Sequence, residues 1–331
     1  GDAFRGDVLL DGAGNIYIAS TTNSGNFPLT NQGNGLENFL SPGSGYNAFV
    51  CKLTPSLSML WGGIFGGTGA DAAYSMQRDS QGRVYVCGGT TSPDFRITNG
   101  AYASTYQGGV ADGFVARISA DGRTLERTTY IGTSDYDQAQ FLQLDAMGNV
   151  YLLGQTLGYF PIPPGLYGAL GGPQFIQKLN PDLNTNIYRT AFGSRGGNKS
   201  GPNLVPTAFL VDDCERVYVS GWGGEDNAGY LGGTTNGLPT TADAVQRNTD
   251  GSDFYLAQFA AGMTGLEYAT FFGENNITSP EHVDGGTSRF DKRGIVYQAV
   301  CASCRGTQGF PVPPGAGSFS THNGSSNCNN A

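Results

Sequence analysis

The chain alternates short apolar runs with clusters of Gly, Asn, Asp, Ser and Thr, and one apolar run returns five times. Its first copy is GNIYIAS, at Gly14–Ser20. The shared tyrosine stands at Tyr17, Tyr85, Tyr151, Tyr218 and Tyr297, with spacings of 68, 66, 67 and 79 residues. A nearly constant period indicates a repeat architecture. Because each run is short and bounded by turn-forming residues, it is predicted to be a β-strand.

Two further phrases recur in the same register. One resembles NAFVCKL and occurs at Asn47–Leu53, Asp112–Ile118, Pro173–Leu179 and Asp253–Phe259. The other ends in an aromatic residue followed by Gly, at 60–67, 125–132, 187–193 and 266–273. A fourth run precedes an acidic turn, as at Ala73–Asp79 and Ala139–Asp145. The repeat therefore predicts four strands in each unit, which we name A to D in chain order, with the tyrosine run as strand B.

The connection between strands A and B joins an Asp to a Gly three residues later. This pattern occurs at 11–14, 79–82, 145–148 and 291–294. An Asp carboxylate accepts backbone N–H groups in a tight turn, and Gly adopts the positive φ needed to enter the next strand. The fourth copy departs, with Arg216 where Gly is expected. Either that turn differs, or a residue other than Gly bears the strain.

Strand B is apolar on successive residues, as in Val84-Tyr85-Val86. A strand that is apolar on both faces is buried between two layers. Four-stranded antiparallel sheets covered on both faces and repeated at a fixed period are typical of β-propeller blades. A helical solenoid conflicts with the strand pattern, and a two-sheet sandwich would show cleaner alternation. The predicted fold class is thus all-β, a β-propeller.

The predicted propeller is one domain over residues 1–331, and we expect it to be a segment of a larger protein. Its units span approximately 1–68, 69–134, 135–200, 201–278 and 279–331, of which the last is incomplete. The chain stops where strand C of the fifth unit should begin, since Asn327 aligns with Asn47. Closed rings have four to eight blades. Either other strands complete a fifth blade or the ring includes residues outside this chain, and we favour a larger ring or a truncated chain.

Composition narrows the range of partners. The 331 residues include 53 Gly, about twice the usual share, and carry a net charge of −9. An acidic surface repels phosphate backbones and anionic lipids, so nucleic acid is not an expected partner. No apolar run is long enough to span a bilayer, so membrane insertion is not expected. The first residues lack the basic start and apolar stretch of a signal peptide, so we expect a processed protein or a fragment.

The motif set resembles a known bacterial repeat. D-x-x-G-N-[IV]-Y-[IV], then F-P, then D-[AG]-F-V-x-[KR]-[LI], then L-x-[WY]-x-x-[FY]-[LIF]-G is similar to SBBP-type β-propeller repeats, over nearly the whole chain. Residues 284–328 resemble propeller segments of large exported Bacteroidetes proteins, which often carry adhesion modules and a sorting domain of the gliding-motility, type IX-secreted kind. No such sorting domain lies within these 331 residues. The resemblance implies an extracellular or cell-surface setting and supplies no catalytic residue.

Six cysteines are compatible with a secreted protein that has a few disulfides. They are Cys51, Cys87, Cys214, Cys301, Cys304 and Cys328. The CASC run at 301–304 resembles half a zinc or redox site, but zinc needs four ligands and the chain has two histidines. Buried thiols or structural bridges are the preferred interpretation. Cys304–Cys328 is the favoured bridge among 15 possible pairings, because it would pin the loop between them.

No catalytic, cofactor-binding or metal-ligating residue is predicted. The chain lacks G-x-S-x-G, H-E-x-x-H and Walker motifs, so it is not expected to be an enzyme. NTDGSD, at Asn248–Asp253, resembles a calcium loop but lacks the alternating ligands and the distal Glu. A turn leading into strand C is the preferred interpretation of this segment. Calcium is the weaker one, so no cofactor is expected.

The fourth unit departs most from the repeat, through a longer connection at Gly221–Pro239. Its Trp222 and Tyr230 could form an exposed aromatic platform for a sugar or a partner protein. Packing of Trp222 between blades is the preferred alternative. The recurring Phe-Pro pairs after strand B, such as Phe27-Pro28 and Phe310-Pro311, are interpreted as packing aromatics followed by a strand stop.

These observations favour a non-enzymatic extracellular scaffold, adhesion or protein-interaction propeller of a bacterial surface or secreted protein. Its expected partners are other surface proteins or glycans. Two alternatives remain open: a secreted propeller that binds or degrades carbohydrate, and a subunit that self-associates into a surface layer or filament. The fold alone does not choose among them.

Overall fold

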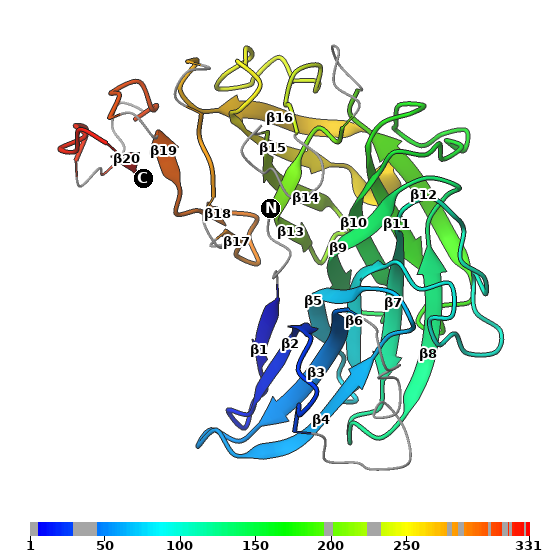
Figure 1. Cartoon of the computed structure of the whole chain (residues 1–331). Coiled ribbons are helices and arrows are strands. Elements are labelled where there is room, and N and C mark those ends of the chain that lie inside the picture. The colour runs from blue at the N-terminus through cyan, green and yellow to red at the C-terminus, as the bar shows by residue number, and fades with distance from the viewer. Residues whose placement is uncertain are drawn as a thin grey trace. The chain divides into compact units, whose positions relative to one another are not determined.

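A computed structural model describes residues 6–28, 45–194, 201–223, 233–276, 280–283, 288–303, 306–312, 317, 320–327 and 329–331 (Figure 1). The chain forms two compact units. The first comprises residues 1–2, 161–174 and 190–331, and the second comprises 3–160 and 175–189. Each unit is described below by itself.

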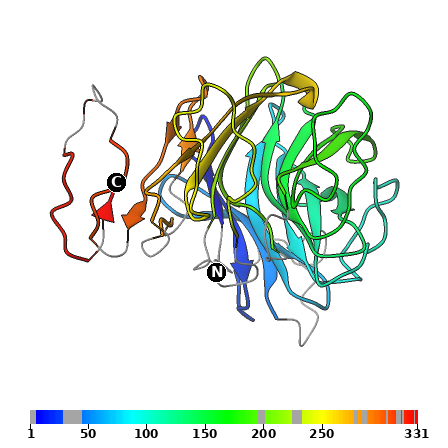
Figure 2. The ribbon, with the colours of Figure 1, turned by 90° about the horizontal axis from the view of Figure 1, so that it is seen from above.

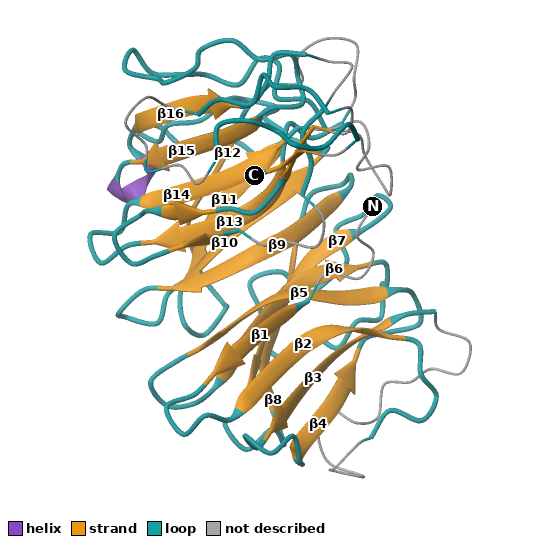
Figure 3. Ribbon diagram, turned by 90° about the vertical axis from the view of Figure 1, so that its left-hand side faces the viewer, coloured by secondary structure: helices purple, strands orange, loops and turns teal. Residues whose placement is uncertain are grey.

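Four antiparallel sheets of four strands form most of the regular secondary structure of the described residues (Figure 3). In each sheet the strands follow one another in chain order. The first sheet contains β1 (Asp7–Leu10), β2 (Ile16–Thr22), β3 (Asn47–Leu53) and β4 (Met59–Phe65). The second contains β5 (Asp71–Arg78), β6 (Val84–Thr90), β7 (Asp112–Ile118) and β8 (Leu125–Ile131). They are the predicted strands A to D of the first two copies.

The third and fourth sheets repeat this plan. The third contains β9 (Asp137–Leu144), β10 (Val150–Thr156), β11 (Gln174–Leu179) and β12 (Asn186–Phe192). The fourth contains β13 (Val205–Val211), β14 (Val217–Trp222), β15 (Phe254–Phe259) and β16 (Leu266–Phe272). A 3₁₀ turn, η2 (Ala261–Met263), precedes β16. Within the described part of the chain, no helix is long and apolar enough to cross a membrane.

The fifth copy is incomplete, as predicted. It has β17 (Arg289–Phe290) paired with β18 (Val296–Tyr297), and β19 (Cys301–Ser303) paired with β20 (Asn329–Asn330). Figure 2 shows the short arrows of β19 and β20 side by side near the C-terminus. Strand C therefore does begin at the end of the chain. Its register places Asn329, two residues beyond the predicted Asn327, at the position of Asn47.

Successive sheets in the second unit pack face to face as β-propeller blades. Strand β5 contacts β1, β2 and β3 of the preceding sheet, and β9 contacts β5, β6 and β7 in the same way. The predicted burial of strand B on both faces is confirmed for β6, β10 and β14, in which every residue is buried. The first copy is only partly buried in β2. In the fifth copy Tyr297 is 55% exposed, and its sheet consists, among the described residues, of the two-residue strands β17 and β18.

Aromatic residues fill the space between blades. Phe114 of β7 packs on Phe65 of β4, with ring centroids 5.7 Å apart, and on Phe95, at 4.7 Å. Phe95 occupies the place of the predicted Phe-Pro aromatic. Phe27 and Phe49 form the same contact in the first copy, at 4.8 Å. The interpretation of these residues as packing aromatics is confirmed.

The turn between strands A and B has the predicted geometry. In the second copy, Asp79 Oδ1 accepts the N–H groups of Gln81 and Arg83 at 3.0 and 2.9 Å, and Gly82 has φ 83°. In the fourth copy, the prediction that Arg216 takes the place of the glycine is wrong by one residue. Glu215, not Arg216, occupies the glycine position and has φ 61°, so a residue other than Gly does bear the strain there.

A β-bulge in strand A faces a strand-B glycine in three copies. The pairing skips Tyr74, Gln140 and Thr207. The facing glycines are Gly88, Gly154 and Gly221, and a Cβ at Gly88 would lie 1.8 Å from the carbonyl oxygen of Ala72. Glycine is required here because the bulged strand approaches the partner backbone too closely for a side chain.

Candidate functional site

Polar side chains gather beside the glycine that ends each strand D. They come from the start of strand C and from the segment that leads into the next strand A, and we call them junction side chains. The glycines are Gly66, Gly132, Gly193 and Gly273. The junction side chains are Asn47 and Asp71, then Asp112 and Asp137, then Asn203, then Asp253 and Glu281. A Cβ on any of these glycines would collide with a junction oxygen, which explains the recurring aromatic-Gly phrase.

In the first junction, Asp71 is buried and well supplied with hydrogen bonds. Its carboxylate accepts the Gly67 N–H at 2.8 Å, the Ser92 hydroxyl at 3.0 Å and the Thr90 hydroxyl. Burial nevertheless raises the pKa of Asp71 to about 6. The carboxyl of Asp71 acts here as a structural acceptor that ties β5 and β6 to the preceding turn.

The second junction places two buried carboxyls beside Gly132. A Cβ on this glycine would lie 2.5 Å from Asp112 Oδ1 and 3.2 Å from Asp137 Oδ2. Oδ2 of Asp137 accepts the N–H and hydroxyl of Thr133 at 2.6 and 2.7 Å, whereas Oδ1 of each Asp has no hydrogen-bond partner. Burial, together with the charge of Asp137, raises the pKa of Asp112 to about 7. Burial raises the pKa of Asp137 to about 6.

These raised pKa values make the folded chain less stable as the pH rises. A carboxyl whose pKa is higher in the folded state stabilises the fold below its unfolded pKa, and that contribution is lost as the pH rises through the folded pKa. Replacing Asp112 by Asn, the residue that the first copy has at Asn47, removes this dependence. Between pH 5.5 and 8.5 we expect Asp112→Asn to gain about 2 kcal/mol of unfolding free energy relative to the wild type.

Urea unfolding at the two pH values measures this change. Asp121→Asn is the matched control, because Asp121 is exposed and a hydrogen bond from the Ser119 hydroxyl lowers its pKa. The control should not gain stability on going to pH 8.5. An Asp112→Asn variant that follows the wild type at both pH values would contradict the assignment of a buried, protonated carboxyl.

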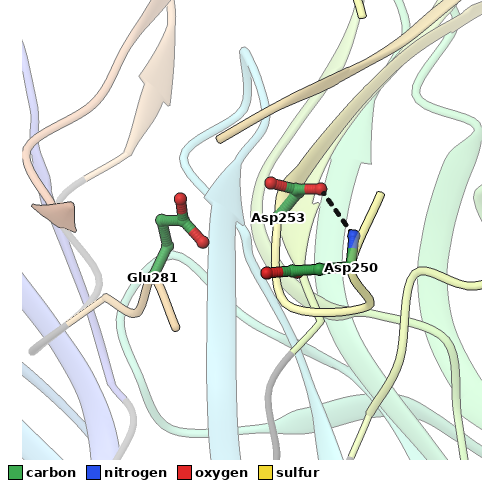
Figure 4. A group of neighbouring side chains, drawn as sticks. All are labelled: Asp250, Asp253 and Glu281. Atoms are coloured by element: carbon green, nitrogen blue, oxygen red, sulfur yellow. Dashed lines mark hydrogen bonds between the residues drawn. The ribbon is translucent and has the colours of Figure 1, made fainter. Parts of the chain in front are cut away.

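The junction beside Gly273, in the first unit, contains a third acidic side chain. Asp250, in the turn before β15, joins Asp253 and Glu281, and one carboxylate oxygen from each lies within 4.8 Å of the others (Figure 4). Asp253 and Glu281 are fully buried, and Asp250 is partly buried. Among the described residues, no ion pair involves any of the three.

Hydrogen bonds satisfy only part of this three-acid cluster. Oδ2 of Asp253 accepts the N–H of Asp250 at 3.3 Å and Nε2 of Gln246 at 3.3 Å. The Ser252 hydroxyl lies 2.6 Å from Asp250 Oδ1 and 3.3 Å from Glu281 Oε2. Oδ1 of Asp253 and Oδ2 of Asp250 are buried without a hydrogen-bond partner. Among the described residues, the cluster is the one group of three acidic side chains whose oxygens lie close enough to share a metal ion.

Burial is also the main influence on the acidity of this cluster. It raises the pKa of Asp253 to about 6, with a further increase from the charge of Asp250. It raises the pKa of Glu281 to about 8, with further increases from both aspartates. In the absence of a cation, Glu281 therefore holds a proton at neutral pH.

The sequence pattern predicts a turn for the segment that holds two of these three acids, and it predicts no metal ligand. Asn248–Asp253 was identified as a turn into strand C with a weak likeness to a calcium loop, and Asp250 and Asp253 do occupy such a turn. Glu281 was missed because it lies 28 residues beyond Asp253, outside any local motif. A signal was available: Asp71 and Asp137 open strand A in the earlier copies, so an acid was to be expected before the fifth.

Trp222 does not form an exposed platform. It is 3% exposed and packs with Phe254, Val283 and Val300, so the packing interpretation holds for this residue. Tyr230 lies outside the described residues. So do Cys304 and Cys328, whose bridge stays a prediction. Of the other cysteines, Cys51, Cys87 and Cys301 are buried and Cys214 is exposed.

Two pockets are lined by residues of the fifth copy. One, of about 320 Å³, is apolar and is lined by Phe254, Leu256, Phe272, Val296, Gln298, Val300, Phe310 and Ala331. Ala331 pairs with Val300 and thus stands where Phe114 stands in the second copy. This pocket is the space that the strand-C aromatic fills elsewhere. The other, of about 340 Å³, is polar and lies among Gln308, His322 and Asn323.

No protein-family model matches the chain, and no curated protein matches it by sequence. Several solved structures are similar in part. The WD40 domain of Neurospora crassa Pan2 has a TM-score of 0.35 at 11% identity, over 81% of this chain and 66% of that one. A thermostable family-43 glycoside hydrolase has 0.34 at 11%, over 94% and 95%. A protein of unknown function from Dyadobacter fermentans has 0.32 at 11%, over 91% and 90%. At these TM-scores, the likeness supports no functional conclusion.

Proposed function

We propose that this chain is a non-enzymatic scaffold or protein-interaction module of a secreted or surface-exposed bacterial protein. One observation supports this proposal above the others: the buried acids stand beside equivalent strand-D glycines, copy after copy. A catalytic pair would be expected in one blade only, as a departure from the repeat. Here the same places hold Asn47 with Asp71, or Asn203, so the chemistry of the side chain changes while its place in the fold is kept.

The arrangement of the blades fits such a role. Sheets covered on both faces are rigid, and their loops are free to vary without disturbing the core. The extracellular setting rests on the repeat motif described above. The expected partners are other surface proteins or glycans, including further copies of the chain.

A glycan panel tests the non-enzymatic part of the proposal. The purified chain is incubated with chromogenic glycosides and with soluble polysaccharides, and both released product and binding are measured. We expect no turnover above a heat-denatured sample. Turnover that Asp112→Asn or Asp253→Asn abolishes would overturn the proposal, because these acids would then be catalytic. Binding without turnover would agree with the non-enzymatic role and would identify glycans as the class of partner.

A further inference from the structure

We propose that Asp250, Asp253 and Glu281 form a calcium-binding site. The inference is independent of the scaffold role, since it concerns an inorganic ligand of three named carboxylates. The following features of the cluster support it.

The spacing of the three carboxylates fits a bound cation. Calcium lies about 2.3–2.6 Å from each oxygen ligand, so two oxygens on opposite sides of the ion are about 5 Å apart. One oxygen from each of the three side chains falls within 4.8 Å of the others. Asp253 Oδ1 and Glu281 Oε1 also face the same glycine, at 2.2 and 2.8 Å from the place of a Gly273 Cβ. Figure 4 shows the three carboxylates gathered around one space.

Two of the buried carboxylate oxygens lack a hydrogen-bond partner. Asp253 is fully buried, yet its Oδ1 receives no hydrogen bond, and the same holds for the buried Oδ2 of Asp250. An unpartnered buried carboxylate is costly unless a cation or a proton neutralises it. The junctions in the rest of the described chain hold at most two carboxyls, whereas this one holds three. A single divalent cation would neutralise most of their charge and bind both orphan oxygens.

The ligand chemistry favours calcium over other metals. All three ligands are carboxylates, and the site includes no His or Cys ligand that would suit zinc or copper. The Ser252 hydroxyl, within 3.3 Å of Glu281 Oε2, is a further oxygen next to the cluster. Calcium accepts six to eight oxygens in irregular geometry, while magnesium requires a regular octahedron and retains several waters. A cluster of carboxylate and hydroxyl oxygens without octahedral symmetry fits calcium better.

The ligands come from two successive copies of the repeat. Asp250 and Asp253 precede β15 of the fourth sheet, whereas Glu281 precedes His282, which forms a bridge with Cys301 of β19. Val283 and Val300 then pack on Trp222. An ion at this place would therefore fasten the segment 280–303 to the fourth sheet.

Titration of the EDTA-treated full-length chain with CaCl₂ tests the site. For the wild type we expect one ion per chain by calorimetry, with Kd about 10⁻⁴ M, the range of extracellular calcium modules. Melting followed by tryptophan fluorescence should shift upward by about 5 °C at 10 mM CaCl₂. MgCl₂ at the same concentration should have less than half this effect.

Asp253→Asn and Glu281→Gln should each weaken calcium binding at least tenfold and remove the calcium-dependent shift in melting. Asp112→Asn, in the second junction, should bind calcium as the wild type does. Terbium luminescence, displaced by calcium, provides a second readout for any variant whose melting is altered. Absence of calcium binding by the wild type at 10 mM would overturn the proposal, because protons alone would then neutralise the carboxyls. Equal binding by Asp253→Asn would also overturn it, because calcium would then not depend on the Asp253 carboxylate.

Discussion

Phe114→Ala is expected to lower the unfolding free energy of the second unit by about 4 kcal/mol. Phe114 is fully buried, and its ring contacts those of Phe65 and Phe95 between two sheets. Its removal leaves a cavity bounded by β-strands, which cannot close because each backbone is fixed by hydrogen bonds to its neighbours. The loss therefore includes both the transfer of the ring to water and the unfilled space.

The two tryptophans provide the measurement. Trp61 belongs to the second unit and Trp222 to the first, so a Trp222→Phe background makes Trp61 the reporter of the unit that contains Phe114. Urea unfolding then gives the unfolding free energy of the Trp222→Phe protein with and without Phe114→Ala. Met147→Ala is the control, because Met147 is 78% exposed and should cost about 0.5 kcal/mol or less. A Phe114→Ala cost no larger than the control would mean that the aromatic cluster does not hold the blades together.

Gly154→Ala is expected to cost about 3 kcal/mol or to prevent folding of the second unit. An added Cβ would lie 2.2 Å from the carbonyl oxygen of Gln138 and 2.3 Å from the ring of Phe175. The carbonyl belongs to the bulged strand and cannot retreat without breaking its pairing. The ring of Phe175 is fully buried and packs on the ring of Phe160, with centroids 5.3 Å apart.

A second substitution separates the two clashes. Gly154→Ala with Phe175→Leu relieves the contact with the ring but leaves the contact with the carbonyl, so we expect only partial recovery. Gly12→Ala is the matched control, since a Cβ there meets nothing within 4 Å and no positive φ is required. Soluble yield and urea midpoints report both outcomes. Wild-type stability of Gly154→Ala would show that the bulge adapts to a side chain.

The fold was predictable because it repeats. The tyrosine run, the strand-C phrase and the aromatic-Gly phrase each mark a strand, and errors in one copy are corrected by the others. The Asp79–Gly82 turn was predictable for the same reason, since carboxylate acceptance and positive φ are local properties. The fold class and four complete units followed from these local rules.

Features that depend on distant residues were not predictable. The bulge opposite Gly154 arises from how two strands pair. A single glycine in one strand does not predict a bulge in its partner. Glu281 joins Asp250 only after the 30 intervening residues have folded. The exposure of Tyr297 reflects missing neighbours, although its local sequence matches that of the buried Tyr85. Sequence patterns identify the strand, and tertiary contacts decide its burial.

The consecutive strand order within each sheet affects how the chain is made. At about 5–20 residues per second, a ribosome completes one sheet of some 66 residues within roughly 3–13 seconds. All hydrogen-bonded neighbours of that sheet are then already available, so local pairing can proceed quickly. One apolar face of each newly formed sheet nevertheless stays uncovered until the next copy emerges. The nascent chain is thus most prone to aggregate during the interval between one blade and the next.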